Sequence, residues 1–268
     1  MKKLTALLLT AVLSIGLLAG CGSKEADAST VKVGASPVPH AQILEVVKEE
    51  LAKQDITLEI VEFTDYIQPN EAVESGDIDA NYFQHITYMD AFNADHGTHL
   101  VSLGAIHYEP FGIYAGTSDS LTALPQGAKI GIPNDPTNGG RALLLLQEQG
   151  LITLPADCGL EPKVLDIVED NGYKIVEMEA AQLPLSLDSL DLAVINGNYA
   201  IQAGLDVSSA LAIEAADGIA GTAYANVLSV KEGNEENPNL TALLAALQSE
   251  AVKDYIAENY DGAVVPTF

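Results

Sequence analysis

From residue 31 onward the sequence alternates short β-type runs with helical patterns, and this alternation restricts the fold more than any other feature. Strands separated by helices are typical of layered α/β architectures with parallel sheets. The predicted strands are Val31–Ala35, Thr57–Phe63, Ile78–Phe83, Leu100–Ile106, Phe111–Tyr114, Lys129–Ile132, Tyr173–Met178, Leu192–Ile195 and Ala225–Val230. Helical patterns cover Ala41–Lys53, residues 85–95 and, as one long segment, Leu240–Glu258. The predicted fold class is therefore α/β.

The charge of the chain limits its partners. It has 268 residues, enough for one large or two ordinary domains, with 38 acidic and 12 basic residues and a formal net charge of −26. Nucleic-acid binding needs clustered Lys and Arg, so this composition argues against it. Arg141 is the one arginine among the basic residues, which marks it as a candidate for a specialised role.

The N-terminus is typical of an export signal. Two lysines precede an uncharged run, Leu4–Leu18, which is shorter than the ~20 residues that a bilayer-spanning helix needs. The run ends in Leu18-Ala19-Gly20-Cys21, which resembles the lipobox of bacterial lipoproteins. In that motif the cysteine receives a diacylglycerol and the peptide is cut before it. We therefore predict that residues 1–20 are a signal peptide and that Cys21 is lipidated.

The residues after Cys21 predict a lipidated flexible tether over residues 21–30, because they are small and polar and lack apolar periodicity. Two acyl chains give stable membrane anchoring where one does not. The predicted location is the cell membrane, on its extracytoplasmic face. Lipidation of Cys21 leaves Cys158 unpaired, so no intramolecular disulfide is expected.

The segment Lys129–Arg141 carries the strongest candidate for ligand binding. A strand is expected to end at Pro133, and a helix to begin among the capping residues Asp135–Asn138. The glycines before Arg141 would let an anion approach backbone N–H groups. Arg141 adds a planar fork suited to a carboxylate, whereas a phosphate-loop lysine is missing. The alternative for Arg141 is a surface salt bridge.

Aromatic and amide side chains follow several of the predicted strands. Tyr66, Phe83, His85 and Tyr88 concentrate after two of them, although a satisfied core position is the alternative for His85 and Tyr88. Asn196 and Asn226 stand at or beside two later strands. Amides both donate and accept, which suits an ammonium beside a carboxylate, but they are also common in turns.

Five segments, in order, resemble the NlpA-type methionine-binding lipoproteins that serve ABC importers: FTDYIQPN, NYFQH followed by Tyr88, DPTNGGRALLLLQ, DLAVIN and AYAN. The resemblance covers essentially the whole chain from the lipobox. It implies a bilobed periplasmic-binding-protein fold of type II, with an amino acid in the cleft. It also implies that Arg141 grips the α-carboxylate, that Asn196 and Asn226 bind the amino-acid backbone, and that four residues enclose the side chain: Tyr66, Phe83, His85 and Tyr88.

The resemblance also implies a domain order and a set of partners. The first lobe would comprise residues 31–113 and 224–268, and the second lobe residues 114–223. The protein would capture L- or D-methionine and deliver it to a permease driven by a separate ATPase, with no cofactor of its own. Two departures bear on the side-chain pocket: Thr87 stands where many relatives have a proline, and Tyr82 is larger than the residue expected there.

Three other interpretations remain open at this point. The same fold could hold another apolar amino acid or a methionine dipeptide. A metal-binding lipoprotein could use His96 and His99, with His107 nearby in sequence, although Gly97 interrupts their helix. An enzyme is disfavoured because the sequence contains none of the common hydrolase, metalloprotease or nucleotide-binding motifs.

Overall fold

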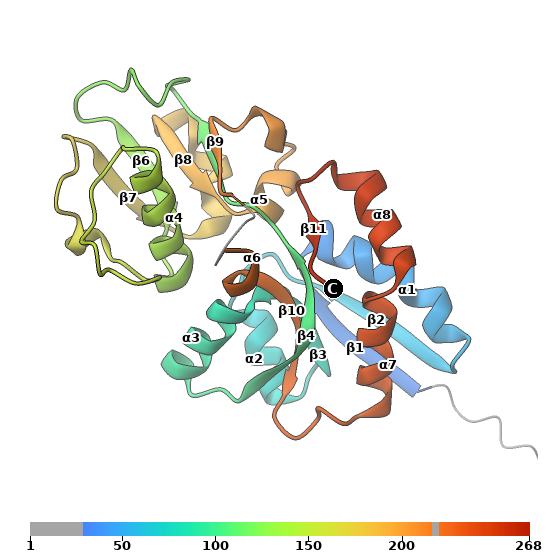
Figure 1. Cartoon of the computed structure of the whole chain (residues 1–268). Helices are drawn as coiled ribbons and strands as arrows, with labels where there is room; N and C mark the ends of the chain where they lie inside the picture. The colour runs from blue at the N-terminus through green and yellow to red at the C-terminus, as the bar shows by residue number, and fades with distance from the viewer. Residues whose placement is uncertain (1–28, 216–219) are drawn as a thin grey trace, which may run out of the picture.

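The computed structural model describes residues 29–215 and 220–268. The predicted signal peptide and Cys21 lie outside the described residues. Two α/β lobes, each built on its own sheet, make up the protein (Figure 1). Within the described part of the chain, no helix combines the length and the apolar character needed to cross a bilayer.

The first lobe contains a six-stranded sheet in the order β11-β4-β10-β3-β1-β2. Its strands are β1 (Ser29–Ala35), β2 (Ile56–Glu62), β3 (Ala80–His85), β4 (Leu100–Tyr108), β10 (Ala225–Lys231) and β11 (Val265–Pro266). β1 pairs in parallel with β2 and β3, whereas β10 is antiparallel to both β3 and β4. β1 includes Ser29 and Thr30, which the sequence assigns to the tether.

The second lobe contains a five-stranded sheet in the order β7-β6-β8-β5-β9. Its strands are β5 (Gly112–Ala115), β6 (Lys129–Pro133), β7 (Lys174–Met178), β8 (Leu192–Ile195) and β9 (Ala212–Ile213). β6 is parallel to β7 and β8, but β5 is antiparallel to β8 and β9. The expectation of parallel sheets is therefore wrong for both lobes, which are mixed.

The chain enters the second lobe at β5 and returns to the first lobe at β10, and both of these strands run antiparallel to their neighbours. β4 passes directly into β5 through Glu109–Phe111, with no crossover helix between them. A parallel neighbour requires such a crossover, so a strand that arrives directly from the other lobe can run antiparallel. The return connection lies between β9 and β10 and contains α6 (Ala220–Ala223).

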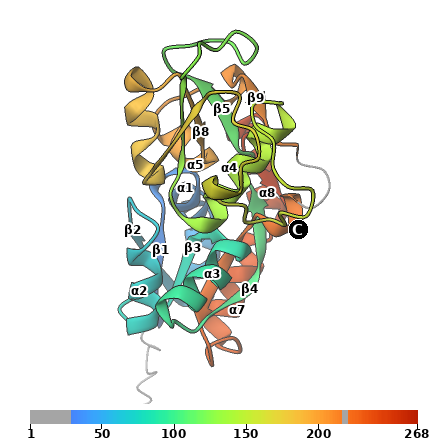
Figure 2. The same cartoon turned by 90° about the vertical axis from the view of Figure 1, so that its left-hand side faces the viewer.

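Helices cover both sheets (Figures 1 and 2). They are α1 (Gln42–Ala52), α2 (Gln68–Ser75), α3 (Ile86–His96), α4 (Pro136–Glu148), α5 (Gly197–Gln202), α7 (Pro238–Leu247) and α8 (Glu250–Tyr260), with short helical turns η1 (Pro37–Ala41), η2 (Val164–Asp166), η3 (Ala180–Gln182), η4 (Pro184–Ser189) and η5 (Val207–Ser209). α1 is amphipathic, as predicted: it buries Ile43, Leu44, Val47 and Leu51 in the core of the first lobe.

The C-terminal helical pattern forms two helices rather than one. α7 ends at Leu247, and Ser249 has extended backbone angles (φ −91°, ψ 159°) before α8 begins. Serine favours the position before a helix, so the chain can turn here at low cost. Gln248 fixes the break because its side chain donates to the carbonyl of Ala105 in β4 (2.8 Å). Tertiary packing thus divides a pattern that is continuous in sequence.

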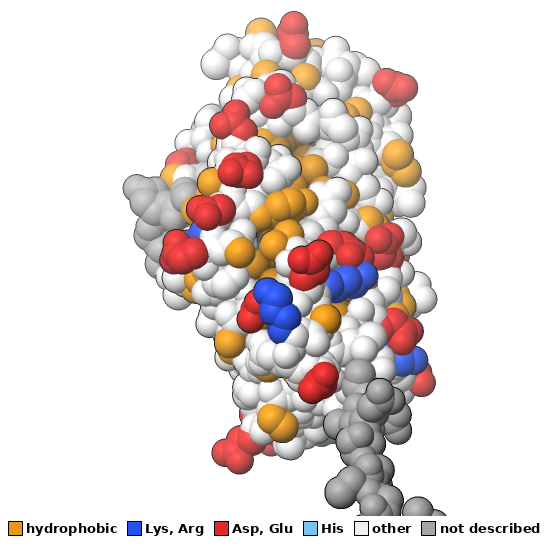
Figure 3. All heavy atoms as spheres, turned by 90° about the vertical axis from the view of Figure 1, so that its right-hand side faces the viewer, with side chains coloured by type: hydrophobic (Ala, Val, Ile, Leu, Met, Phe, Trp, Pro, Cys, Tyr) orange, Lys and Arg blue, Asp and Glu red, His pale blue; other side chains and the backbone are white. Residues whose placement is uncertain are grey.

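The surface reflects the acidic composition. On the face shown in Figure 3, acidic side chains are scattered over the molecule, with only a few basic side chains among them. That face carries no concentrated basic patch of the kind that phosphate backbones require.

Candidate functional site

A cavity with about 340 Å³ of space not filled by protein atoms lies between the lobes. All seven residues predicted to bind ligand line it: Tyr66, Phe83, His85, Tyr88, Arg141, Asn196 and Asn226. Five further lining residues were not among them: Gln84, Glu109, Asn138, Gly197 and Asn198. Both lobes contribute, so closing or opening the cleft must change the cavity.

Arg141 reaches the cavity from α4, whose start follows the sequence prediction. β6 ends at Pro133, and the Asp135 side chain caps the helix by accepting from the backbone N–H of Asn138 (2.9 Å). The glycine before Arg141 has a different role from the one predicted. A Cβ on Gly140 would lie 2.7 Å from Glu161 Cα, so this glycine permits close backbone packing instead of exposing N–H groups to an anion.

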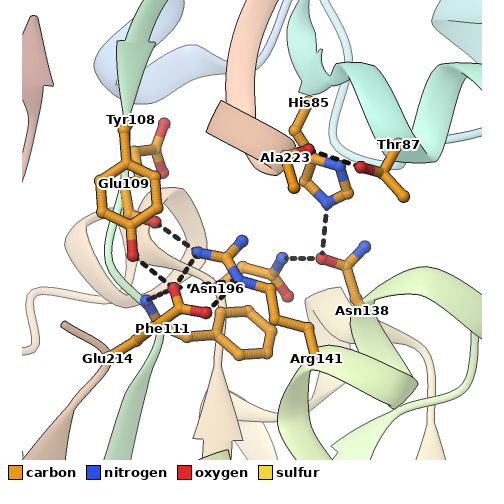
Figure 4. Close-up of polar contacts among 10 residues, drawn as sticks. All are labelled: His85, Thr87, Tyr108, Glu109, Phe111, Asn138, Arg141, Asn196, Glu214 and Ala223. Atoms are coloured by element: carbon orange, nitrogen blue, oxygen red, sulfur yellow. Dashed lines mark hydrogen bonds and ion pairs between the residues drawn. The ribbon is translucent and has the colours of Figure 1, made fainter. Parts of the chain in front are cut away.

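The Arg141 guanidinium is buried, with only 4% of the residue exposed, and is held from several sides (Figure 4). Nε and Nη2 donate to the Glu214 carboxylate, with a shortest distance of 2.5 Å, and Nη2 donates to the Glu109 carbonyl (2.8 Å). The rings of Phe111 and Tyr224 lie 4.5 and 4.2 Å from the guanidinium carbon. No described residue hydrogen-bonds to Nη1, which leaves that nitrogen available to a ligand.

Glu214 is the partner that sequence reasoning missed. Burial lowers the pKa of Arg141, and the charge and hydrogen bonds of Glu214 more than offset this, so the pKa is raised overall. Glu214 also accepts from the Tyr108 hydroxyl, and it lies 73 residues from Arg141 in sequence. No local pattern joins residues that far apart. The pair ties α4 to the return connection between the lobes.

The amide side chain of Asn138 connects α4 to the opposite lobe. Asn138 Oδ1 accepts from Asn196 Nδ2 (2.9 Å) and lies 3.1 Å from His85 Nε2 (Figure 4). Two buried polar atoms at the cavity, Asn196 Oδ1 and Asn198 Nδ2, have no hydrogen-bond partner among the described residues. An unpaired acceptor and an unpaired donor beside a cavity indicate that a ligand completes the network.

Three aromatic residues, Tyr66, Phe83 and Tyr88, form what we call the aromatic wall. Their ring centroids lie 5.7 to 6.3 Å apart. The Tyr88 hydroxyl donates to the Tyr66 carbonyl (3.1 Å), and the Tyr66 hydroxyl donates to Asn198 Oδ1 in the second lobe (2.6 Å). The wall thus belongs to the first lobe and contacts the second.

His85 stands between the aromatic wall and the amides. It is the last residue of β3, and its Nδ1 accepts from the backbone N–H of Tyr88 (3.0 Å) at the start of α3. Burial, and secondarily the charge of Arg141, lowers the pKa of His85 to about 3. The imidazole is therefore neutral near pH 7 and adds no positive charge to the cavity.

The two departures from the family pattern lie outside the cavity. Thr87 donates to the Ala223 carbonyl (2.5 Å), which links α3 to the return connection (Figure 4). Tyr82 is fully buried, and its hydroxyl contacts His107 Nδ1. Tyr82 is not among the residues that line the cavity.

The histidines proposed for the metal alternative do not meet. The His96 ring stacks on Phe92, with centroids 4.0 Å apart, and His99 Nδ1 lies 3.3 Å from Glu74. His107 instead joins His40 and Glu109 in a buried group whose potential ligand atoms lie within 4.8 Å of one another. His107 Nε2 is already 2.7 Å from Glu109 Oε1, so a hydrogen bond accounts for this arrangement.

Comparison with known proteins agrees with this architecture. The model of the NlpA lipoprotein family matches residues 31–268. The chain is 46% identical over 256 residues to the membrane lipoprotein TpN32 of Treponema pallidum, covering 94% of this chain and 92% of that one. It is 42% identical to the D-methionine-binding lipoprotein MetQ of Salmonella typhimurium, with 92% of each chain covered.

A solved structure extends the similarity to the fold. A nutrient binding protein from Burkholderia cenocepacia, bound to methionine, superposes with a TM-score of 0.84 at 41% identity. The match covers 89% of this chain and all of that one. Sequence and fold together confirm the predicted bilobed type II architecture, and the chain belongs to the NlpA lipoprotein family.

Proposed function

We propose that this protein is a lipid-anchored extracytoplasmic receptor that captures methionine, L or D, and delivers it to an ABC importer. The observation that carries the proposal is the buried Arg141, which lines the same cavity as the aromatic wall and whose Nη1 has no partner among the described residues. One ligand that is charged at one end and apolar at the other satisfies both. Relatives named for methionine binding support this choice.

In this proposal the polar groups hold the ligand backbone. Arg141 Nη1 donates to the α-carboxylate, and a charge-assisted bond in a desolvated site is strong. Asn196, whose Oδ1 is unpaired, accepts from the ligand. Asn226 closes the site from β10, where its own Oδ1 is 3.0 Å from His40 Nε2.

The side chain lies against the aromatic wall and His85. A thioether against aromatic rings is favourable by roughly 0.3–1.5 kcal/mol per contact. Discrimination against other apolar side chains of similar length is expected to be modest, about 1–3 kcal/mol per misplaced methylene. Another apolar amino acid therefore remains the second candidate. A methionine dipeptide has to fit its additional residue into the same cavity.

The lobe boundaries in this proposal are residues 31–113 with 224–268 for the first lobe and 114–223 for the second. Ligand contacts both lobes, so it favours the closed form by differential binding about a hinge. The hinge consists of the two connections, near Glu109–Phe111 and between β9 and β10. The closed form would then dock on a membrane permease that a separate ATPase drives.

Membrane attachment rests on the N-terminal sequence. Residues 1–20 act as the signal peptide, Cys21 carries the lipid, and the residues that follow form the tether. Labelling with a radioactive fatty acid in a bacterial host tests the anchor. A Cys21→Ala variant should lose the label and appear in the soluble fraction, and an unchanged label would contradict the assignment.

Mass spectrometry of ligand released from the purified, denatured protein tests the function. Methionine recovered at close to one equivalent is the expected result. Calorimetry on the refolded, ligand-free protein then compares L-methionine, D-methionine, norleucine and glycyl-methionine. Another co-purified amino acid would move the proposal to the second candidate, and bound zinc or manganese without an amino acid would overturn it.

A further inference from the structure

The cavity has one acidic lining residue among the described residues, and sequence reasoning assigned it no role. That residue is Glu109, in the first connection between the lobes. Its carboxylate is buried, with 5% of the residue exposed. Burying a carboxylate is costly unless it is paired, so its partners indicate what it does.

Glu109 places a negative group beside the Arg141 guanidinium. The Glu109 carbonyl accepts from Arg141 Nη2 (2.8 Å), and the guanidinium is close enough for its charge to lower the pKa of the Glu109 carboxyl against the effect of burial (Figure 4). An α-amino acid carries its carboxylate and its ammonium on one carbon atom. Opposite charges this close together on the wall of a cavity are complementary to that zwitterion.

The Glu109 carboxylate is held in a fixed position by both lobes. Oε1 is 2.7 Å from His107 Nε2 and 3.4 Å from His40 Nε2, both in the first lobe. The backbone N–H of Asn198 in the second lobe lies near enough to the carboxylate to lower its pKa. Gly197 leaves room for it, because a Cβ there would lie 2.8 Å from Oε2.

The partners of Glu109 orient it without cancelling its charge. Burial lowers the pKa of His40 to about 4 and that of His107 to about 3, so both imidazoles are neutral near pH 7. Arg141, the nearest permanent cation, already pairs with Glu214. Burial raises the pKa of Glu109, although His40, the Asn198 N–H and Arg141 oppose this. The carboxylate thus lacks a cation of its own.

We infer that Glu109 is the counter-charge for the α-ammonium of the ligand, and that it makes the receptor selective for free α-amino acids over deaminated or N-acylated analogues. This inference rests on the proposed function and specifies its substrate class. It also disfavours an Xaa-Met dipeptide, because the methionine nitrogen is then an uncharged amide.

Ligand affinity should depend on the protonation state of Glu109. The ammonium binds the ionised carboxylate, so protonation of Glu109 competes with the ligand. Affinity should therefore fall as the pH is lowered toward the raised pKa of Glu109, and binding in that range should release a proton. The other groups facing Glu109 do not titrate there: His40 and His107 charge only at lower pH, Arg141 stays charged, and the buried tyrosines 66, 82 and 260 stay neutral.

The test compares methionine with 4-(methylthio)butanoate, which keeps the carboxylate and thioether but lacks the ammonium. Calorimetry measures both ligands on the wild type, on Glu109→Gln, and on Glu62→Gln as a matched control. Glu62 is exposed at the end of β2 and does not line the cavity, so Glu62→Gln removes an equal charge away from the site. A site built to pair a polar group rejects the analogue that lacks it by at least about 100-fold.

We expect the wild type and Glu62→Gln to prefer methionine by that factor, and Glu109→Gln to retain a preference of about tenfold or less. A preference that survives in Glu109→Gln overturns the inference but leaves the proposed function intact. Absence of methionine binding to the wild type rejects the proposed function itself. These two failures are distinguishable because the first is seen only in the variant.

If circular dichroism shows that Glu109→Gln does not fold, a second measurement on the wild type replaces the comparison with that variant. Methionine binding to the wild type is then measured at a series of pH values from 7 down to 4.5, the ordinary glutamate pKa, in two buffers of different ionisation enthalpy. Proton release on binding supports the inference. Heats that are independent of the buffer, with an affinity equal to that at pH 7, overturn it.

Discussion

The two ends of the cavity are built in different ways. The aromatic wall comes from Tyr66, Phe83 and Tyr88, which lie close together in sequence and belong to one lobe. The polar end comes from Glu109, Arg141 and their partners, which are spread over more than a hundred residues and include both connections between the lobes. The aromatic wall offers apolar area, where one apolar side chain can replace another at modest cost. The polar end holds desolvated charges, where few substitutions are tolerated.

Affinity and selectivity are therefore expected to depend on different ends of the cavity. Every amino acid has the same backbone, so the polar end determines how tightly the class is bound. The wall touches only the side chain, so it determines which member is preferred. Variants at the two ends should separate these quantities.

The largest effect is expected at the polar end. Arg141→Ala should weaken methionine binding by about 3–5 kcal/mol, because it leaves a buried carboxylate without its partner. This corresponds to roughly a hundred- to several-thousand-fold in Kd. Calorimetry should show a similar loss for methionine and for alanine. Arg141→Lys keeps the charge but not the planar fork, so it should recover only part of the affinity.

If Arg141→Ala left the affinity for methionine unchanged, the carboxylate clamp would have to be abandoned. The variant also leaves Glu214 without its cation, so thermal unfolding should be measured alongside binding. A loss of affinity in a protein that remains folded is what supports the assignment.

An intermediate effect is expected at the aromatic wall. Phe83→Ala should cost methionine about 1.5–3 kcal/mol, from lost apolar contact and lost sulfur–aromatic interaction. Alanine, whose methyl group is too short to fill that space, should lose much less. The control is Phe92→Ala, an aromatic residue behind Tyr88 that does not line the cavity. Equal losses for both ligands would contradict the division between the two ends.

A smaller effect, on stability, is expected at Gly140, which precedes Arg141 in α4. Gly140→Ala places a Cβ 2.7 Å from Glu161 Cα and 2.9 Å from the Leu160 carbonyl, and backbone cannot move aside cheaply. Urea unfolding should show a destabilisation of about 1–3 kcal/mol. Gly104→Ala is the comparison, since its Cβ meets only side-chain ends. The preference for methionine over alanine should survive, because the wall is in the other lobe.

The smallest effect, measured over one pH unit, is a pH dependence of stability. Burial lowers the pKa of His85 from 6.5 to about 3, so between these values the unfolded chain binds a proton that the folded protein does not. The free energy of unfolding should therefore decrease as the pH falls below about 6.5, by up to about 1.4 kcal/mol per unit from this histidine. Urea titrations at several pH values should show a shallower decrease for His85→Asn. An identical slope would mean that His85 is not held neutral.

Much of the architecture could be predicted from the sequence. The strand at Leu192–Ile195 has its predicted bounds, and α4 begins within the predicted range Asp135–Asn138, because apolar runs, capping residues and proline act locally. The break between α7 and α8 and the mixed strand directions were not, because both depend on how distant elements pack. The same distinction applies at the site. The composition of the chain singles out Arg141, whereas nothing local in the sequence identifies Glu214 as its partner.

Local preference and recognisable segments were enough to predict most of the strands, the family, and seven of the residues that line the cavity. Only the tertiary structure decided what each charge is paired with: Arg141 with Glu214, and Glu109 with His107. The physical reason is that Coulombic and hydrogen-bond energies depend on distance in space and on burial. Neither quantity is set by separation along the chain.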